Sequence, residues 1–201
     1  MRHSELLAAI SDLEPIEARG SFQRHCSLRW DGLRPSAAGG RWGERGAFEV
    51  LYLGRPAESV IVEAYRHRVD DDIDHSAELA ATVVERRLYT MDVAVPNVLD
   101  LRPMTARRRV GLTDDQFRSD IDDYTPCQAV AAAAHQLGLG GILAPAATGL
   151  GETSPCSRST SHTCTSRPSP TARSGTACQP TRVGCAWPTT QARPGRMTPV
   201  R

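Results

Sequence analysis

The chain changes composition abruptly near residue 151, and this change limits what its last part can fold into. Residues 1–150 contain 22 acidic side chains and 17 arginines, whereas residues 151–201 contain 7 arginines and a single acid, Glu152. The second segment holds 7 Ser, 10 Thr and 7 Pro. It offers too little apolar surface to offset the conformational entropy that is lost on ordering. We therefore expect a folded domain over residues 1–151 and a disordered tail over residues 152–201.

The tail also looks like translation in a shifted reading frame. The segment before it, GGILAPAATGLGE, reads as a buried strand and a glycine-rich turn, and Ser, Thr, Pro, Arg and Cys follow at once. The chain contains no lysine, which fits a GC-rich gene. We predict a frameshift near codon 152. The four cysteines of the tail match no zinc-binding spacing, and we expect no disulfide framework and no metal site.

Charge and hydropathy limit the location and the partners that we expect. The longest apolar runs are short and interrupted, which excludes a membrane span. The segment MRHSELLAAISDLEP carries acids within its apolar stretch, so we do not expect it to be a secretory signal. The formal net charge of +1 gives no reason to expect direct nucleic-acid binding. We expect a soluble, cytoplasmic protein.

Within residues 1–150, short helices and strands alternate without strict βαβ order, which predicts a mixed α/β sheet. The expected strands span residues 18–28, 48–53, 82–93, 97–101 and 141–145. The expected helices span residues 4–13, 56–69 and 125–137, and a further short helix follows a capping box at Thr113–Gln116. A second capping box is expected at Thr125–Gln128, with Thr125 as N-cap and Pro126 at the first helical position.

Two arginines stand where they could bind an anion. Arg24 lies in an extended segment, and Arg41 directly follows Gly39 and Gly40. A guanidinium is a fixed fork of donors that suits bidentate contacts to phosphate. Adjacent glycines allow the backbone to approach such a ligand closely.

A tyrosine and a glutamate complete this set. Tyr52 lies within a strand that looks buried, where its hydroxyl needs a partner or a cleft. Glu63 lies among apolar residues of the next predicted helix, at a polar edge or in a site. Two arginines, an aromatic residue and a glutamate suit an anionic ligand that carries an aromatic group, such as a dinucleotide.

Each of these residues also has a structural interpretation. Arg24 and Glu63 could form an ion pair within the fold, Gly39-Gly40 could be an ordinary turn, and capping alone would explain Thr125. Cys127, early in its helix, could have a lowered pKa or could be a small buried residue. The histidines at positions 25, 67 and 135 are isolated, with no arrangement of a carboxylate and a nucleophile nearby in the sequence.

The ordered set of motifs resembles the RES family, named for an arginine, a glutamate and a serine. The matching motifs are the Phe-Gln-Arg-His segment with Arg24, GGRW at 39–42, LYLG at 51–54, Glu63, TPCQAV at 125–130 and LAPAA at 143–147. The resemblance covers about residues 15–151. It implies an ADP-ribosyltransferase-like fold and a toxin that cleaves NAD+ at the nicotinamide–ribose bond. NAD+ would be the substrate and phosphate or water the acceptor, with no cofactor, whereas some members transfer ADP-ribose to a protein.

The resemblance also implies roles for single residues. Arg24 matches the family arginine and Glu63 the family glutamate, which makes both catalytic candidates. The positions that match the NAD+ pocket are Gly40, Arg41, Tyr52 and Thr125, where threonine replaces the family serine. The implied partner is a helix-turn-helix antitoxin from a two-gene module, in a hetero-oligomer or beside a homo-oligomer of this chain.

The altered end leaves two further hypotheses open. Loss of the last strands would expose an unpaired sheet edge, which could leave a catalytically dead remnant. Alternatively, the body could fold and serve only as a binding module for the antitoxin.

Overall fold

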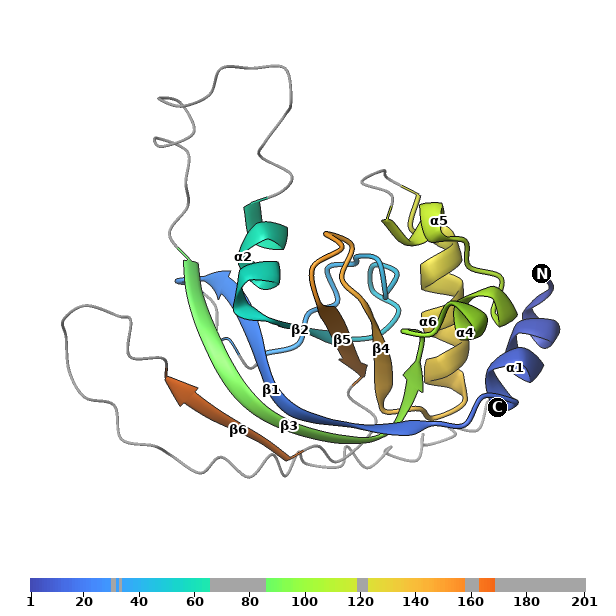
Figure 1. The fold of residues 1–201 in the computed structure, drawn as a ribbon, viewed down its shortest axis with the longest axis horizontal. Helices are drawn as coiled ribbons and strands as arrows, with labels where there is room; N and C mark the ends of the chain where they lie inside the picture. Colours follow the sequence, from blue (N-terminus) through green and yellow to red (C-terminus); the bar gives the residue numbers. More distant parts are fainter. Residues whose placement is uncertain (30–31, 33, 66–85, 119–122, 158–162, 169–201) are drawn as a thin grey trace, which may run out of the picture.

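The computed structural model describes residues 1–29, 32, 34–65, 86–118, 123–157 and 163–168 (Figure 1). The strands are β1 (Ile16–Ser27), β2 (Val50–Arg55), β3 (Arg86–Asp100), β4 (Gly141–Pro145), β5 (Glu152–Ser157) and β6 (Thr163–Pro168). The helices are α1 (His3–Ser11), α2 (Ala57–Tyr65), α4 (Met104–Arg109), α5 (Asp114–Arg118) and α6 (Thr125–Gln136). The predicted mixed α/β class is confirmed.

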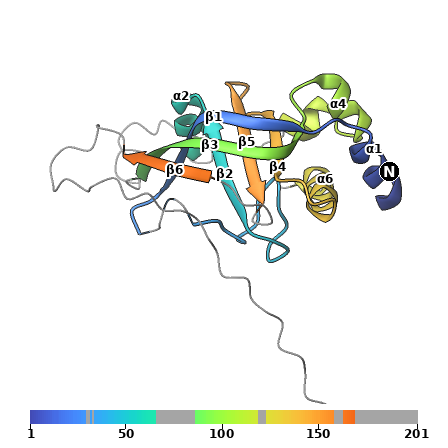
Figure 2. The ribbon, with the colours of Figure 1, turned by 90° about the horizontal axis from the view of Figure 1, so that it is seen from below.

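Five of the strands form a closed ring. Hydrogen bonds join the sheet in the order β1-β2-β5-β4-β3-β6, and β1 pairs with β3 as well. The pair β3–β4 is parallel, while the other pairs are antiparallel. In Figure 1 the long, curved strands β1 and β3 sweep around β2, β5 and β4. Figure 2 shows β6 alongside β3, with α1, α4 and α6 grouped at one end of the sheet.

Two strands were predicted separately, over residues 82–93 and 97–101, and the structure joins residues 86–93 and 97–100 of them in the single strand β3. Residues 82–85 lie outside the described residues. The register against β1 shifts between the pairs Ala18–Val95 and Ile16–Val98. Asn97, which lies in this shift, has a φ of 54°. A bulge of this kind lets a strand bend without ending. The sequence therefore looked interrupted where the strand only bends.

Two apolar clusters hold the fold together. The first packs α1, α4 and α6 against β4 and the end of β3, and it includes Trp42 with Tyr52 beside it. The second fills the inside of the ring, with Phe22, Leu53 and Leu143 among its members. Burial of such side chains is worth about 1.5–3 kcal/mol each. Neighbouring residues of β2 therefore serve different clusters, since Tyr52 joins the first and Leu53 the second.

The predicted helix caps have mixed outcomes. The capping box at Thr113–Gln116 is confirmed, because the Gln116 N–H donates to Thr113 Oγ1 at 3.3 Å and the Thr113 N–H donates to Gln116 Oε1 at 3.1 Å. The helix predicted over residues 4–13 is α1, which begins one residue earlier at His3. Arg2 is the N-cap of α1, and its backbone N–H donates to Glu5 Oε2 at 2.9 Å. None of the described helices has the length and apolar character needed to cross a membrane.

Helix α2 lies within the helix predicted from residue 56 to about 69. It spans Ala57–Tyr65, and residues 66–69 lie outside the described residues. Val60 is buried, whereas Ile61 is 46% exposed, so these neighbouring apolar residues do not share one buried face. The helix still carries Glu63 at a half-buried position.

The segment from Glu152 to Ser157, expected to begin a disordered tail, is strand β5 instead. It pairs with β2 along its whole length and with β4 on its other side. Thr153, Ser154 and Cys156 are buried. The boundary predicted after residue 151 is therefore too early, and β4 is not the last strand. Residues 158–162 and 169–201 lie outside the described residues.

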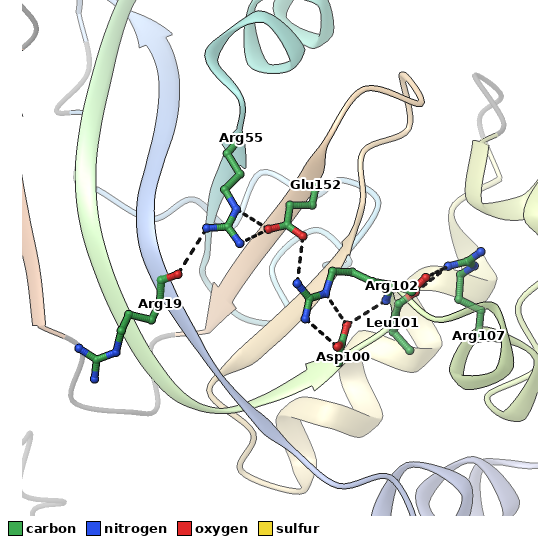
Figure 3. A network of polar contacts seen from close by, with 7 residues as sticks. All are labelled: Arg19, Arg55, Asp100, Leu101, Arg102, Arg107 and Glu152. Atoms are coloured by element: carbon green, nitrogen blue, oxygen red, sulfur yellow. Dashed lines mark hydrogen bonds and ion pairs between the residues drawn. The ribbon is translucent and has the colours of Figure 1, made fainter.

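An ion-pair network fixes the start of β5 (Figure 3). Glu152 pairs with Arg55 at the end of β2 and, at 3.3 Å, with Arg102. Arg102 also pairs with Asp100 at 2.8 Å. These contacts lower the pKa of Asp100, although burial alone would raise it. The network joins the ends of three strands, and nothing in the sequence pattern indicated it.

Candidate functional site

Tyr52 is the residue on which the candidate site converges. Strand β2 holds its backbone between β1 and β5, and its ring packs against the first apolar cluster. The hydroxyl accepts the Trp42 N–H at 3.1 Å. Burial raises the pKa of Tyr52 to about 12, which the Trp42 N–H and Arg41 oppose and the charge of Glu63 reinforces. The phenol therefore stays protonated at neutral pH, where it can both accept and donate a hydrogen bond.

Arg41 stands at the tip of a tight turn. Gly40 and Gly43 exchange backbone hydrogen bonds at 2.9 and 3.3 Å, so Arg41 and Trp42 are the two residues between them. The guanidinium of Arg41 donates to the Gln116 carbonyl oxygen at 3.1 Å and lies 4.9 Å from the centre of the Tyr124 ring. This cation–π contact directs the charge of Arg41 toward the start of α6.

Gly40 is required at its position by the approach of Tyr52. A Cβ added there would lie 2.8 Å from the Tyr52 hydroxyl oxygen and 3.3 Å from Cζ. The sequence analysis expected a ligand to approach this glycine, and in the structure the group that approaches it is the Tyr52 side chain. The alternative of an ordinary turn is confirmed, because the segment closes on Gly43.

Arg24 contacts the backbone of Tyr52. Its guanidinium, carried by β1, donates to the Tyr52 carbonyl oxygen at 3.5 Å and to the Arg34 carbonyl oxygen at 3.1 Å. The neighbouring His25 accepts from Arg86 at 2.9 Å. Burial, followed by the charges of Arg86 and Arg24, lowers the pKa of His25 to about 4. This imidazole is neutral at pH 7.

Glu63 reaches the site from α2. Its carboxylate is near enough to Tyr52 for its charge to raise the pKa of the phenol. The site therefore combines a carboxylate from α2, a phenol from β2 and guanidinium groups from β1 and from the 40–43 turn. Electrostatic groups of both signs around one protected phenol can recognise a ligand that carries both an anionic and a cationic part.

Thr125 is not the N-cap of α6 that the sequence predicted. The N-cap of α6 is Tyr124, and no side chain caps the helix. Thr125 is exposed, and its backbone N–H donates to Asp123 Oδ1 at 3.0 Å. Hydrogen bonds from the side chain and backbone of Thr125 lower the pKa of Asp123. Thr125 lies next to the Tyr124 ring that packs on Arg41, so it borders the site without capping the helix.

Cys127 and His135 belong to the core. Burial raises the pKa of the Cys127 thiol despite the neighbouring Arg41, and the residue is 1% exposed. The alternative of a lowered pKa is wrong, and the buried structural role is confirmed. His135 stacks on Phe48 with ring centres 4.4 Å apart. His67 lies outside the described residues.

Sequence reasoning missed three residues that shape this site: Tyr124, Gln116 and Gln128. Each contacts the 40–43 turn, since Gln128 Nε2 donates to the Gly40 carbonyl oxygen at 2.9 Å. Gln128 belongs to the TPCQAV motif, but the predicted capping box paired it with Thr125 of the same helix. Among the residues that the structure describes, no group of three or more His, Cys, Asp or Glu side chains could hold a metal ion.

The closed mixed sheet with its helices defines an α/β domain that gathers charged groups around Tyr52. The RES domain family model matches residues 18–154, and the chain belongs to this family. The family match includes Gly40, Arg41, Tyr52 and Glu63, and it ends within β5.

The chain is similar to two relatives and to one solved structure. The NAD(+) phosphorylase MbcT of Mycobacterium tuberculosis is 34% identical over 154 residues, which cover 69% of this chain and 77% of that protein. A probable NAD(+) phosphorylase of the same organism is 34% identical over 113 residues, covering 56% of this chain and 50% of that protein. The crystal structure of the M. tuberculosis MbcT–MbcA toxin–antitoxin complex aligns with a TM-score of 0.61 and 33% identity, over 76% of this chain and 82% of that one.

Proposed function

We propose that this protein is a toxin-like enzyme that cleaves NAD+ at the nicotinamide–ribose bond, with phosphate as the preferred acceptor. The observation that carries the proposal is that Arg41 and Glu63 both act on the Tyr52 phenol. The Arg24 guanidinium contacts the carbonyl oxygen of the same residue. NAD+ offers a matching set of groups, since its pyrophosphate is anionic and its nicotinamide ring is cationic. The similarity to proteins named NAD(+) phosphorylase supports the same substrate.

The proposed mechanism uses electrostatic stabilisation. Arg24 and Arg41 bind the pyrophosphate, and Tyr52 packs against the nicotinamide or its ribose. The C–N bond breaks with its electron pair on nitrogen, so the cationic nicotinamide leaves neutral and needs no general acid. Glu63 accepts a hydrogen bond from a ribose hydroxyl and stabilises the positive charge that develops on the sugar.

The acceptor completes the reaction at the anomeric carbon. A phosphate oxygen forms the new C–O bond and yields phosphorylated ADP-ribose, or water forms it and yields ADP-ribose. We favour phosphate because the arginines that hold the pyrophosphate can also position an incoming phosphate. Thr125 borders this region next to Tyr124, and in this proposal its hydroxyl contacts the ligand. Transfer of ADP-ribose to a protein would use the same bond cleavage with a different acceptor.

The partner in this proposal is an antitoxin protein of the helix-turn-helix type. Support comes from the solved relative, which was crystallised as a toxin–antitoxin complex. An antitoxin would be needed in the cytoplasm because an enzyme that consumes NAD+ harms the cell that makes it. Co-purification of the chain with the product of its neighbouring gene tests this partner.

The decisive experiment compares NAD+ consumption by the wild-type chain with that of Glu63→Gln, with and without phosphate. The variant should lose about 10²–10³ in rate, as expected when one preorganised electrostatic contact is removed. Glu58→Gln is the matched control, because Glu58 is an exposed acid in the first turn of the same helix. A thermal melt of each protein shows whether it is folded. Near-normal turnover by Glu63→Gln would overturn the assignment.

A further inference from the structure

The 40–43 turn is fastened to the rest of the molecule by side chains from distant elements. The Trp42 ring is buried in the first apolar cluster, and the Trp42 N–H is bound by Tyr52 from β2. The Gly40 carbonyl oxygen accepts from Gln128 Nε2 at 2.9 Å and from the Gly43 N–H at 3.3 Å. These contacts therefore fix both ends of the turn, and Arg41 lies at its tip.

Gln128 serves this turn instead of its own helix. A glutamine three residues after a threonine at a helix start normally returns to the backbone of the cap. Here the Thr125 N–H is bound by Asp123 Oδ1, and the Gln128 amide spans to a residue 88 positions earlier. The contact that Gln128 makes therefore is not explained by a contribution to the stability of α6.

We infer that Gln128 is a positioning residue for Arg41, which it holds in the binding geometry by fixing the Gly40 carbonyl oxygen. This inference rests on the proposed function only for its kinetic test. Gln128 touches neither Arg41 nor the ligand in this account. It sets the turn from which the guanidinium reaches the Gln116 carbonyl oxygen and the Tyr124 ring.

The position of Arg41 matters because binding of phosphate by a guanidinium depends on geometry. A guanidinium binds phosphate well only when its donors point at the oxygens, and a misplacement of about 1 Å can cost on the order of 100-fold in rate. Without the Gln128 donor, the Gly40 carbonyl oxygen keeps the longer 3.3 Å bond to Gly43. The tip of the turn is then less well defined, although the Trp42 ring remains in the core.

Gln128→Met tests the inference because it removes the donor and keeps the chain length. We expect kcat/KM for NAD+ to fall about 10-fold, mainly through a higher KM, because positioning within a binding site is lost. Gln136→Met is the matched control. Gln136 lies at the other end of α6, where its exposed side chain contacts His3 at 2.9 Å, so its substitution should leave kinetics unchanged.

A double-mutant cycle separates positioning from a general structural role. In an Arg41→Met background, Gln128→Met should cost less than 2-fold, since its effect passes through Arg41. The same 10-fold loss in both backgrounds would show that Gln128 acts independently of Arg41 and would overturn the inference. Gln128→Glu should lose at least as much as Gln128→Met, because a carboxylate cannot donate to a carbonyl oxygen.

A second readout does not depend on activity. Hydrogen exchange of the peptide covering residues 39–43 should become faster in Gln128→Met and stay unchanged in Gln136→Met. If the wild-type chain consumes no NAD+, the proposed function fails, while the exchange experiment still tests the role of Gln128. Unchanged exchange in Gln128→Met would contradict the inference whatever the activity.

Discussion

Strands β4 and β5 are neighbours in the middle of the sheet, yet different forces hold them there. β4 consists of GILAP, and Ile142, Leu143 and Ala144 are almost completely buried. β5 consists of ETSPCS, and its buried side chains include Thr153 and Ser154. The difference shows that apolar burial is one way to place a central strand, while backbone pairing on two sides with ion pairs at one end is another.

The composition of β5 is unusual for its place. Pro155 lies opposite Tyr52 between two paired strands, although proline has no N–H to donate to a ladder. Ser154 is completely buried, and its Oγ lies 3.7 Å from Cys156 Sγ. The family match ends at residue 154, close to the frameshift that we predict near codon 152. The nucleotide sequence tests this prediction, which requires an apolar-patterned continuation in the alternative frame.

The largest effect should come from shortening an apolar side chain of β4. Leu143→Ala should lower the free energy of unfolding by about 2–5 kcal/mol, because it removes buried methyl groups and leaves a cavity in the ring. Urea unfolding measures the change. A loss below 1 kcal/mol would mean that apolar burial is not what holds β4.

The next effect should come from the start of β5. Glu152→Gln leaves Arg55 and Arg102 without their shared carboxylate, and the half-buried site suggests a loss of about 1–2 kcal/mol. The control is Glu17→Gln, because Glu17 pairs with Arg19 on the open surface and should change stability little. Equal effects of the two substitutions would contradict the special role of Glu152.

A smaller change in the free energy of unfolding, of opposite sign, is expected from a substitution inside β5. Ser154→Ala removes a buried hydroxyl that has no equivalent in β4, and it should raise the free energy of unfolding by about 0.5–1 kcal/mol. Thermal or urea unfolding would show the gain. Destabilisation would mean that the hydroxyl contributes a favourable hydrogen bond and that β5 is better adapted to its place than we infer.

The smallest effect concerns pH. The pKa of Asp100 is lowered in the folded protein from its ordinary value of 3.8, so folding favours the ionised carboxylate. The stability from this group is complete above about pH 4 and is lost as the pH falls through the lowered pKa. Asp100→Asn should therefore flatten the decline in stability below pH 4. An acid limb of the same slope in wild type and variant would contradict the proposed contribution of the network.

Local sequence patterns predicted much of the fold. The Thr113 capping box and the β4 strand both follow from residues within a few positions of each other. β5 was missed because a composition argument treats a segment as if it were alone. In the sheet, β2 and β4 satisfy its backbone from both sides, which no count of its own residues reveals.

The candidate site was predictable as a set of residues but not as a geometry. Arg41 and Glu63 both lie near enough to Tyr52 for their charges to act on its phenol. Thr125 was assigned a cap because Pro126 and Gln128 fit the local motif, while the nearer Asp123 takes its amide. The contact from Gln128 to Gly40 joins residues 88 positions apart, and such a contact depends on how α6 packs against the turn.

The central claim of the proposed function is that this chain cleaves NAD+ with phosphate as acceptor. Phosphorus NMR of NAD+ incubated with the full chain in phosphate buffer tests that claim directly. We predict a new phosphomonoester signal that grows as the NAD+ signals decline, and no such change with Glu63→Gln. Unchanged NAD+ signals from a wild-type sample that melts cooperatively would contradict the account.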